Sequence, residues 1–245
     1  MVGPGPYEDA ALAIDKYLWQ KRDMVVLFAA GNEGIDVKPP FGRVDPRSIG
    51  REASAKNCIA VGASENVRTG LTFGGGRPLQ YGRWAGDFAY PPLDTDHLAN
   101  NQDGLAAFSS RGPTRNQRYK PDVVAPGTCI LSARSSRIIQ GRYNEFWGVS
   151  YDDEWSYQGG TSMACPLVAG CCAVIRGCLI DNGAPPPSAA LIKALLINGA
   201  VEIRGQYPPS EIGPAPNNDA GFGRVDIPGS LASIVPGPNW SGGYV

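Results

Sequence analysis

The longest apolar stretch of the chain runs from Met163 to Ile175, with no charged residue before Arg176. A helix that is apolar on every side has no face for water, so we expect this helix to lie buried in the core. Its start is polar, because Thr161 or Ser162 can cap the first backbone amides. The positive end of such a helix also suits chemistry in which an oxyanion develops beside a serine oxygen.

The same pattern of apolar and polar positions predicts the elements around this helix. Helical spacing of apolar residues predicts an amphipathic helix over 8–22. The continuous apolar run over 24–30 predicts a central parallel strand covered on both faces, and a second strand is expected over 58–62. Further along, Ser188 should cap a helix that runs to Asn198 and stops at Gly199.

Length, composition and charge narrow the class of protein. The 245 residues, 42% of them hydrophobic and 18% charged, can bury the core of one large α/β domain. A net charge of −1 gives no argument for nucleic acid or for an anionic membrane as a partner. The apolar stretch over 163–175 falls short of a membrane span. Residues 1–10 have no recognisable secretory signal, so the compartment stays open.

The six cysteines do not form a recognisable framework. Four of them share the predicted apolar helix, where neighbours cannot readily adopt disulfide geometry, and we interpret these four as small buried hydrophobic residues. No C-x-x-C pair suggests zinc. Cys58 and Cys129 are the least constrained candidates for a bridge.

Two sequence blocks carry most of the functional information. Taken alone, Ser162 in Gly-Thr-Ser could be an ordinary helix cap, and Asn32 in Gly-Asn-Glu-Gly an ordinary turn residue. However, GGTSMACP followed by LVAG resembles the nucleophile segment of the subtilisin-like serine proteases, the subtilases. LFAAGNEG resembles a second block of that family, and further blocks at 55–64, 108–114, 120–127 and 222–226 follow in family order.

The resemblance covers roughly residues 7–235 and implies a fold and a site. The fold is α/β in three layers, with a mostly parallel central sheet between helices, incomplete at its N-terminal side. By the same resemblance, Ser162 is the acylating nucleophile and Asn32 donates to the oxyanion. Ala29, Ala30 and Gly31 form one wall of the primary specificity pocket, and Gly160 also binds substrate. We expect a partial peptidase domain over 1–235 and a linker or frayed tail over 236–245.

One departure from the family pattern decides what the chain can do alone. The family order is Asp, His, Ser, with the oxyanion asparagine after the histidine. Here no histidine precedes Asn32, and neither an Asp-Ser/Thr-Gly block nor a His-Gly-Thr block occurs. The sole histidine, His97, lies in a polar stretch over 68–104 that we interpret as a solvated surface insertion. We therefore expect His97 to have no catalytic role, and the chain alone to be a poor catalyst and marginally folded.

Two groups of acidic residues are candidates for binding a metal ion or a substrate. Asp94, Asp96 and Asp103 lie near His97, and structural calcium is common in the family, but the spacing does not fit an EF-hand loop. We assign no metal ligand and no cofactor. The acidic run over 152–154 could face a basic substrate residue, and the simpler interpretation is a solvated loop.

Two functions from different classes remain. One is the C-terminal portion of an active serine endopeptidase that acts on protein or peptide and whose partner is the missing N-terminal portion. The other is a non-catalytic remnant of the fold that binds peptide or protein.

Overall fold

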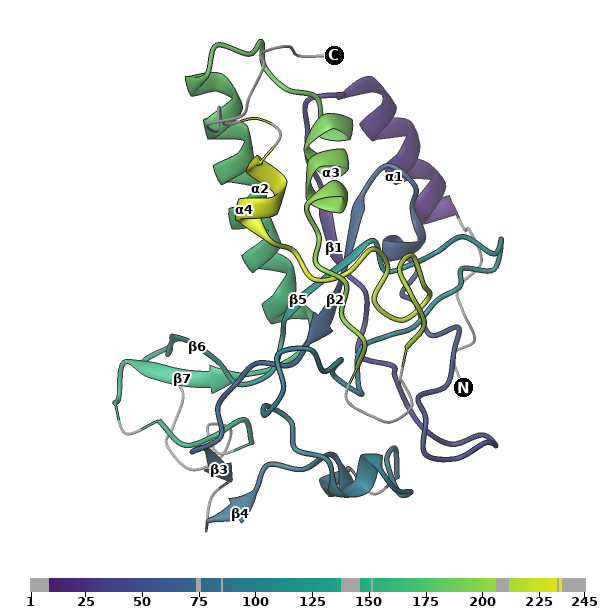
Figure 1. Cartoon of the computed structure of the whole chain (residues 1–245), viewed down its shortest axis with the longest axis vertical. Helices are drawn as coiled ribbons and strands as arrows, with labels where there is room; N and C mark the ends of the chain where they lie inside the picture. The colour runs from purple at the N-terminus through teal and green to yellow at the C-terminus, as the bar shows by residue number, and fades with distance from the viewer. Residues whose placement is uncertain are drawn as a thin grey trace.

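Three apolar runs form the central parallel sheet. The computed structural model describes residues 9–73, 76–84, 86–137, 146–150, 152–205, 212–232 and 234. In it, β1 (Leu27–Ala29), β2 (Ile59–Ser64) and β5 (Val123–Pro126) lie in the order β1-β2-β5 (Figure 1). Leu27 pairs with Ile59, and Val61 pairs with Val123. All of β2 is buried, as expected for a parallel strand that is covered on both faces.

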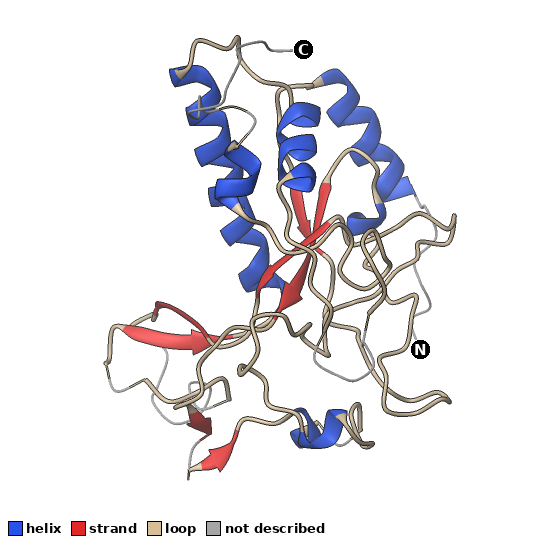
Figure 2. Cartoon of the chain, in the orientation of Figure 1, coloured by secondary structure: helices blue, strands red, loops and turns tan. Residues whose placement is uncertain are grey.

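The alternation of side chains along β2 divides the core into two layers. Ile59, Val61 and Ala63 point into the main hydrophobic cluster, which they share with the long helix α2 (Thr161–Asp181). Ala60 points to the opposite face, into a cluster with Ala53 from the short helix η1 (Glu52–Ser54). On that face α1 (Asp9–Gln20) packs through Ala11 and Leu18, so helices cover both faces of the sheet (Figure 2). The predicted three-layer α/β fold is confirmed.

The prediction that α2 is buried all round is wrong. Ala164, Val168, Cys172, Ile175 and Leu179 are spaced by three or four residues and form one buried stripe against the sheet. On the other side, Leu167 is 43% exposed and Val174 is 52% exposed. The error arises because an apolar sequence shows that a surface can be buried but does not show that this chain has residues to cover it.

Helix α2 (Thr161–Asp181) also extends beyond the uncharged apolar stretch over 163–175. Among the described residues it is the one helix whose length and apolar composition would be enough to cross a membrane. The same test is passed by core helices of water-soluble proteins, and a stripe of α2 does pack against all three strands of the sheet.

The predicted helix after Ser188 is confirmed. Helix α3 spans Ala189–Asn198, and the Ser188 Oγ accepts a hydrogen bond from the Leu191 N–H at 3.2 Å. Gly199 is its C-cap. Asp226 caps α4 (Ile227–Leu231) in the same way, through the Gly229 N–H at 2.8 Å. Helices α2, α3 and α4 pack against one another.

Replacement of the Ser188 cap gives a testable stability effect. We expect Ser188→Ala to lower the free energy of unfolding by about 1 kcal/mol, because the Leu191 N–H loses its acceptor. Ser188→Gly should cost only a few tenths of a kcal/mol, since glycine is itself tolerated at a cap. Urea denaturation of the two variants measures the difference. Equal losses in both variants would show that the cap hydrogen bond is not what stabilises α3.

The polar stretch over 68–104 is not a solvated insertion, which corrects our prediction. It contains β3 (Thr72–Phe73), β4 (Arg77–Pro78) and the short helices η2 (Tyr81–Arg83) and η3 (Leu93–Thr95). Phe73, Tyr81, Phe88 and Leu98 are almost fully buried and belong to the same cluster as α2 and β2. The antiparallel pair of β6 (Ile130–Ala133) and β7 (Trp155–Gln158) lies on the same side of the molecule and leads into α2 (Figure 1).

A buried ionic cluster holds β5 to the rest of the domain. The Asp122 carboxylate lies 2.6 Å from the Lys120 Nζ and 2.9 Å from the Lys193 Nζ, and it also accepts the Ala60 N–H at 2.7 Å. Burial lowers the pKa of Lys193, and the Asp122 charge opposes that shift. The cluster therefore ties β2, the entry to β5 and α3 together.

The cysteines among these elements are all free thiols. Cys58 and Cys129, the predicted candidates for a bridge, are both buried and belong to different hydrophobic clusters. The predicted tail over 236–245 lies outside the described residues.

Candidate active site

The carboxyl end of β1 meets the start of α2 through one asparagine. Asn32 Oδ1 accepts hydrogen bonds from the Thr161 backbone N–H at 2.9 Å and from the Thr161 hydroxyl at 3.0 Å. The Thr161 Oγ1 in turn accepts the Gly31 N–H at 3.3 Å. Thr161 is fully buried, so these bonds fix the Asn32 amide against the helix end. This corrects the prediction that Thr161 or Ser162 caps α2, since the first amide is capped by Asn32, 129 residues away.

Among the described residues, two N–H donors next to the start of α2 have no acceptor, one on the Asn32 side chain and one on the Ser162 backbone. Because Asn32 Oδ1 is occupied, the other end of the amide, Nδ2, is the end presented outward, and no described residue accepts a hydrogen bond from it. Met163 and Ala164 donate to the Gly160 carbonyl at 3.0 and 3.4 Å. The Ser162 N–H has no acceptor among the described residues, as is usual in the first turn of a helix. Ser162 itself is exposed beside these donors.

Gly160 gives the turn before Ser162 its shape. Its φ of 135° lies in a region that residues with a side chain rarely adopt. A Cβ added there would also lie 3.3 Å from Asn32 Nδ2. A side chain at this position would therefore strain the backbone and crowd the asparagine amide. The Gly160 N–H donates to the Gly127 carbonyl at 2.7 Å, which anchors the turn to the end of β5.

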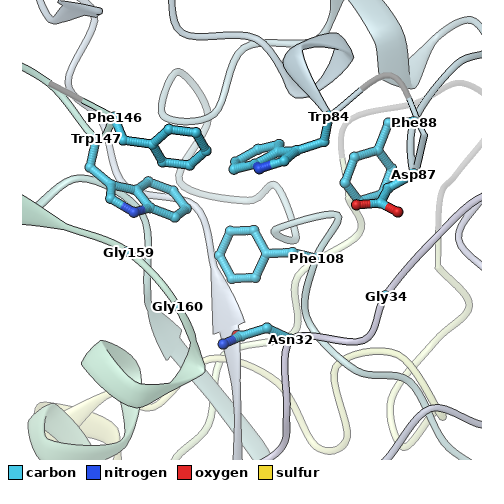
Figure 3. A pocket seen from close by; sticks show the side chains of 10 residues that line it. All are labelled: Asn32, Gly34, Trp84, Asp87, Phe88, Phe108, Phe146, Trp147, Gly159 and Gly160. Atoms are coloured by element: carbon cyan, nitrogen blue, oxygen red, sulfur yellow. The ribbon is translucent and has the colours of Figure 1, made fainter. Parts of the chain in front are cut away.

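A cavity of about 220 Å³ opens next to these groups. Asn32, Gly159 and Gly160 line it (Figure 3), and the two glycines directly precede Thr161 and Ser162 in the chain. The remaining wall is mostly aromatic, and its side chains are Trp84, Phe88, Phe108, Phe146 and Trp147. Gly34 and Asp87 complete the lining.

The predicted substrate-binding residues are only partly brought together at this cavity. Gly160 lines it, whereas Ala29, Ala30 and Gly31 do not. Ala30 is fully buried in the cluster with Ala53 and Ala60, and Ala29 ends β1. The predicted role of Ala29, Ala30 and Gly31 as a pocket wall stays a prediction.

The aromatic wall is the feature of the site that we did not predict from the sequence. Trp84 and Phe88 come from the stretch over 68–104, Phe108 from the loop before β5, and Phe146 and Trp147 from the segment before β7. A signal was present, because Tyr81, Trp84 and Phe88 are spaced by three and four residues, as on one packed helical face. The surrounding glycines and polar residues obscured it.

His97 lies in a setting that does not suit a general base. It is half-buried, and its Nδ1 accepts a hydrogen bond from the Ala99 N–H at 3.1 Å. In the neutral ring the other nitrogen then carries the proton, so no lone pair remains free to take one from a serine. Burial lowers the pKa of His97, which favours this neutral form.

The lowered pKa of His97 predicts a pH-dependent stability. In the unfolded chain the imidazole takes up a proton as the pH falls through about 6.5, whereas the folded state resists it. Stability should therefore be constant above that pH and fall just below it, until the folded pKa is passed. His97→Gln should remove this dependence. Urea denaturation at pH 5.5–7.5 checks this, and an unchanged slope in the variant would contradict it.

Within the described residues, no group of three or more His, Cys, Asp or Glu side chains is arranged to hold a metal ion. Asp94 and Asp96 flank the end of η3, where the Asp96 side chain accepts the His97 N–H at 2.9 Å. The acidic run over 152–154 is exposed, and Asp153 pairs with Arg134 at 2.9 Å.

The site places a serine at the N-terminus of a helix that packs on the sheet, beside N–H donors that have no acceptor among the described residues. This arrangement is typical of a serine hydrolase built on an α/β sheet. Comparison with known proteins then gives the family. Residues 2–223 match the model of the Subtilase family, and the chain belongs to that family.

Individual relatives agree with this assignment. The chain is similar to the Serine protease/ABC transporter B family protein tagD of Dictyostelium discoideum, with 27% identity over 87% of the chain and 14% of that protein. It is 32% identical to Pyrolysin of Pyrococcus furiosus, over 83% of the chain and 12% of that protein. Among solved structures, the Prenylagaramide maturation protease PagA has a TM-score of 0.52 at 18% identity, over 92% of this chain and 56% of that one. The chain thus spans about half of that solved relative and a small part of the curated ones.

Proposed function

We propose that this chain is the nucleophile-bearing portion of a serine endopeptidase. Membership in the subtilase family supports serine peptidase chemistry on protein or peptide substrates in general. The finer proposal rests on the Asn32 amide, whose oxygen accepts hydrogen bonds from Thr161. Its N–H group and the Ser162 N–H have no acceptor among the described residues.

In the proposed reaction the Ser162 Oγ attacks the peptide carbonyl carbon while a histidine takes the hydroxyl proton. Negative charge develops on the carbonyl oxygen, and the Ser162 N–H and Asn32 Nδ2 donate hydrogen bonds to it. The histidine then protonates the leaving amine as the C–N bond breaks. Water attacks the resulting ester, which releases the acid and restores Ser162.

The histidine of this mechanism has to come from outside the 245 residues, because His97 is the sole histidine in them and its Nδ1 is occupied. We propose that the partner is a polypeptide that carries the Asp and His blocks of the same protease. Two features support it. The outer side of α2 exposes Leu167, Val174 and Ile180, and β1 forms one edge of the sheet, with no further strand paired to it among the described residues. An apolar helix face and an open sheet edge are surfaces that a further part of a domain covers.

The alternative function is a non-catalytic protein that uses the same site to bind peptide or protein. The absence of the Asp and His blocks from the chain favours it. Sequencing the native transcript upstream of the Met1 codon separates the two. An open frame that continues into Asp-Ser/Thr-Gly and His-Gly-Thr blocks supports the endopeptidase. An in-frame stop directly upstream supports the binding protein.

A further inference from the structure

We infer that the aromatic cavity beside Asn32 selects one aromatic side chain of the substrate, at a position next to the bond that is cut. This inference rests on the proposed function and names its substrate class. Trp84 and Trp147 are the specificity-determining residues, and Phe88, Phe108 and Phe146 complete the wall.

The size and chemistry of the cavity support a single aromatic side chain. Its volume of about 220 Å³ is below the roughly 300 Å³ at which pockets for drug-sized molecules begin. Among the described residues that line the cavity, all of the large side chains are aromatic, and the sole charged one is Asp87, which is exposed. The lining therefore favours an apolar ring and disfavours an acidic side chain.

The rings around the cavity are arranged to receive another ring. Trp84 and Phe146 lie edge to face, with centroids 5.0 Å apart, and Phe108 and Trp147 do so at 5.5 Å. Edge-to-face contact is the geometry in which aromatic pairs gain energy beyond simple burial. Figure 3 shows the rings of Trp84, Phe108 and Trp147 turned around a shared space above Asn32. A substrate ring placed there extends the same network.

The cavity shares residues with the turn that leads to Ser162. The Trp147 ring packs directly on Gly159, so closely that a Cβ on this glycine would lie 2.4 Å from the indole. Gly159 and Gly160 lead directly to Thr161 and Ser162. Asn32 belongs both to the cavity wall and to the pair of unpaired donors. A peptide whose carbonyl oxygen meets those donors therefore has a neighbouring side chain within reach of the cavity.

The test measures binding to the full chain carrying Ser162→Ala, which prevents cleavage. The ligands are three short peptides that are identical except for Phe, Ala or Asp at one central position. Titration calorimetry or NMR should show that the Phe peptide binds about ten-fold or more tightly than the Ala peptide. The Asp peptide should bind most weakly.

Variants of the aromatic wall then show which residues cause the preference for the Phe peptide. Trp147→Ala should reduce the Phe preference to near unity, whereas Trp155→Ala, at a half-exposed tryptophan in β7 outside the cavity, should leave it intact. Phe146→Leu is the variant of choice if Trp147→Ala does not fold, because Phe146 is 37% exposed and contributes little to the core. It should reduce the preference several-fold.

Equal affinity for the Phe and Ala peptides would overturn the inference, and so would an equal loss of preference in Trp147→Ala and Trp155→Ala. The proposed function is tested separately, by covalent labelling of Ser162. A Phe preference without labelling in the presence of the partner polypeptide would keep the subsite and reject the endopeptidase. Labelling without a Phe preference would keep the endopeptidase and reject the subsite.

Discussion

A fluorophosphonate probe is expected to label Ser162 rapidly only when a polypeptide with the Asp and His blocks is added to the chain. The probe reacts with a serine whose proton is taken by a base, and no described side chain forms a hydrogen bond with the Ser162 hydroxyl. The expected difference is on the order of 10⁶, the loss measured when the histidine is removed from subtilisin, a member of this family. The unpaired N–H donors and the helix dipole remain in the chain alone, so a small residual rate should persist.

The measurement is the time course of labelling by gel fluorescence, with the site assigned by mass spectrometry. Ser162→Ala should abolish labelling in the mixture. His97→Gln should leave it unchanged, because the His97 Nδ1 is occupied by the Ala99 N–H. Rapid labelling of the chain alone, lost in His97→Gln, would show instead that His97 acts as the base.

The second large effect is expected at Asn32. Asn32→Asp keeps an oxygen where Asn32 Oδ1 accepts from the Thr161 N–H and hydroxyl, and replaces the outward N–H donor by a negative oxygen. The fold at the start of α2 should survive, while the developing oxyanion loses one donor and meets a like charge. We expect turnover in the reconstituted enzyme to fall by at least about 10²–10³, the cost of removing this donor in subtilisin.

Thr161→Val is the matched control for Asn32→Asp. It removes the hydroxyl that holds Asn32 Oδ1 but keeps the amide donor and the Thr161 backbone N–H. Turnover should fall less than in Asn32→Asp, because the amide is loosened and not lost. Steady-state kinetics should place both effects mainly in kcat, since the donors bind the transition state more strongly than the substrate. A change confined to KM would show that Asn32 contacts only the ground state.

The sequence predicted β2 and α3 well because their signals are local, whereas the predicted central strand over 24–30 is the shorter edge strand β1, whose residues are only partly buried. The run that became β2 and the cap at Ser188 both depend on a few neighbouring residues, and the structure has them where expected. The motifs around Asn32 and Ser162 predicted that the two residues belong to one site, and the structure places Asn32 at the start of the helix that carries Ser162. Family blocks in order also predicted the three-layer fold.

The errors concern contacts between residues far apart in the chain. Capping rules consider only the next few residues, so they could not find Asn32 as the group that caps α2. The stretch over 68–104 looked solvated because its average polarity is high, although Phe73, Tyr81 and Phe88 are buried. We expected the outer side of α2 to be covered because it is apolar. Whether it is covered depends on which other residues pack against it, and the apolar pattern of the helix itself does not contain that information.

The uncovered side of α2 should affect the heat capacity change of unfolding, which calorimetry measures. The heat capacity change of unfolding grows with the apolar surface that unfolding newly exposes. Leu167, Val174 and Ile180 are already about half exposed in the folded chain, so unfolding newly exposes only the rest of their surface. The heat capacity change of the chain alone should therefore be slightly smaller than it would be with that surface covered. Association with the partner polypeptide would bury the same surface, so the complex should unfold with a larger heat capacity change than its parts measured separately.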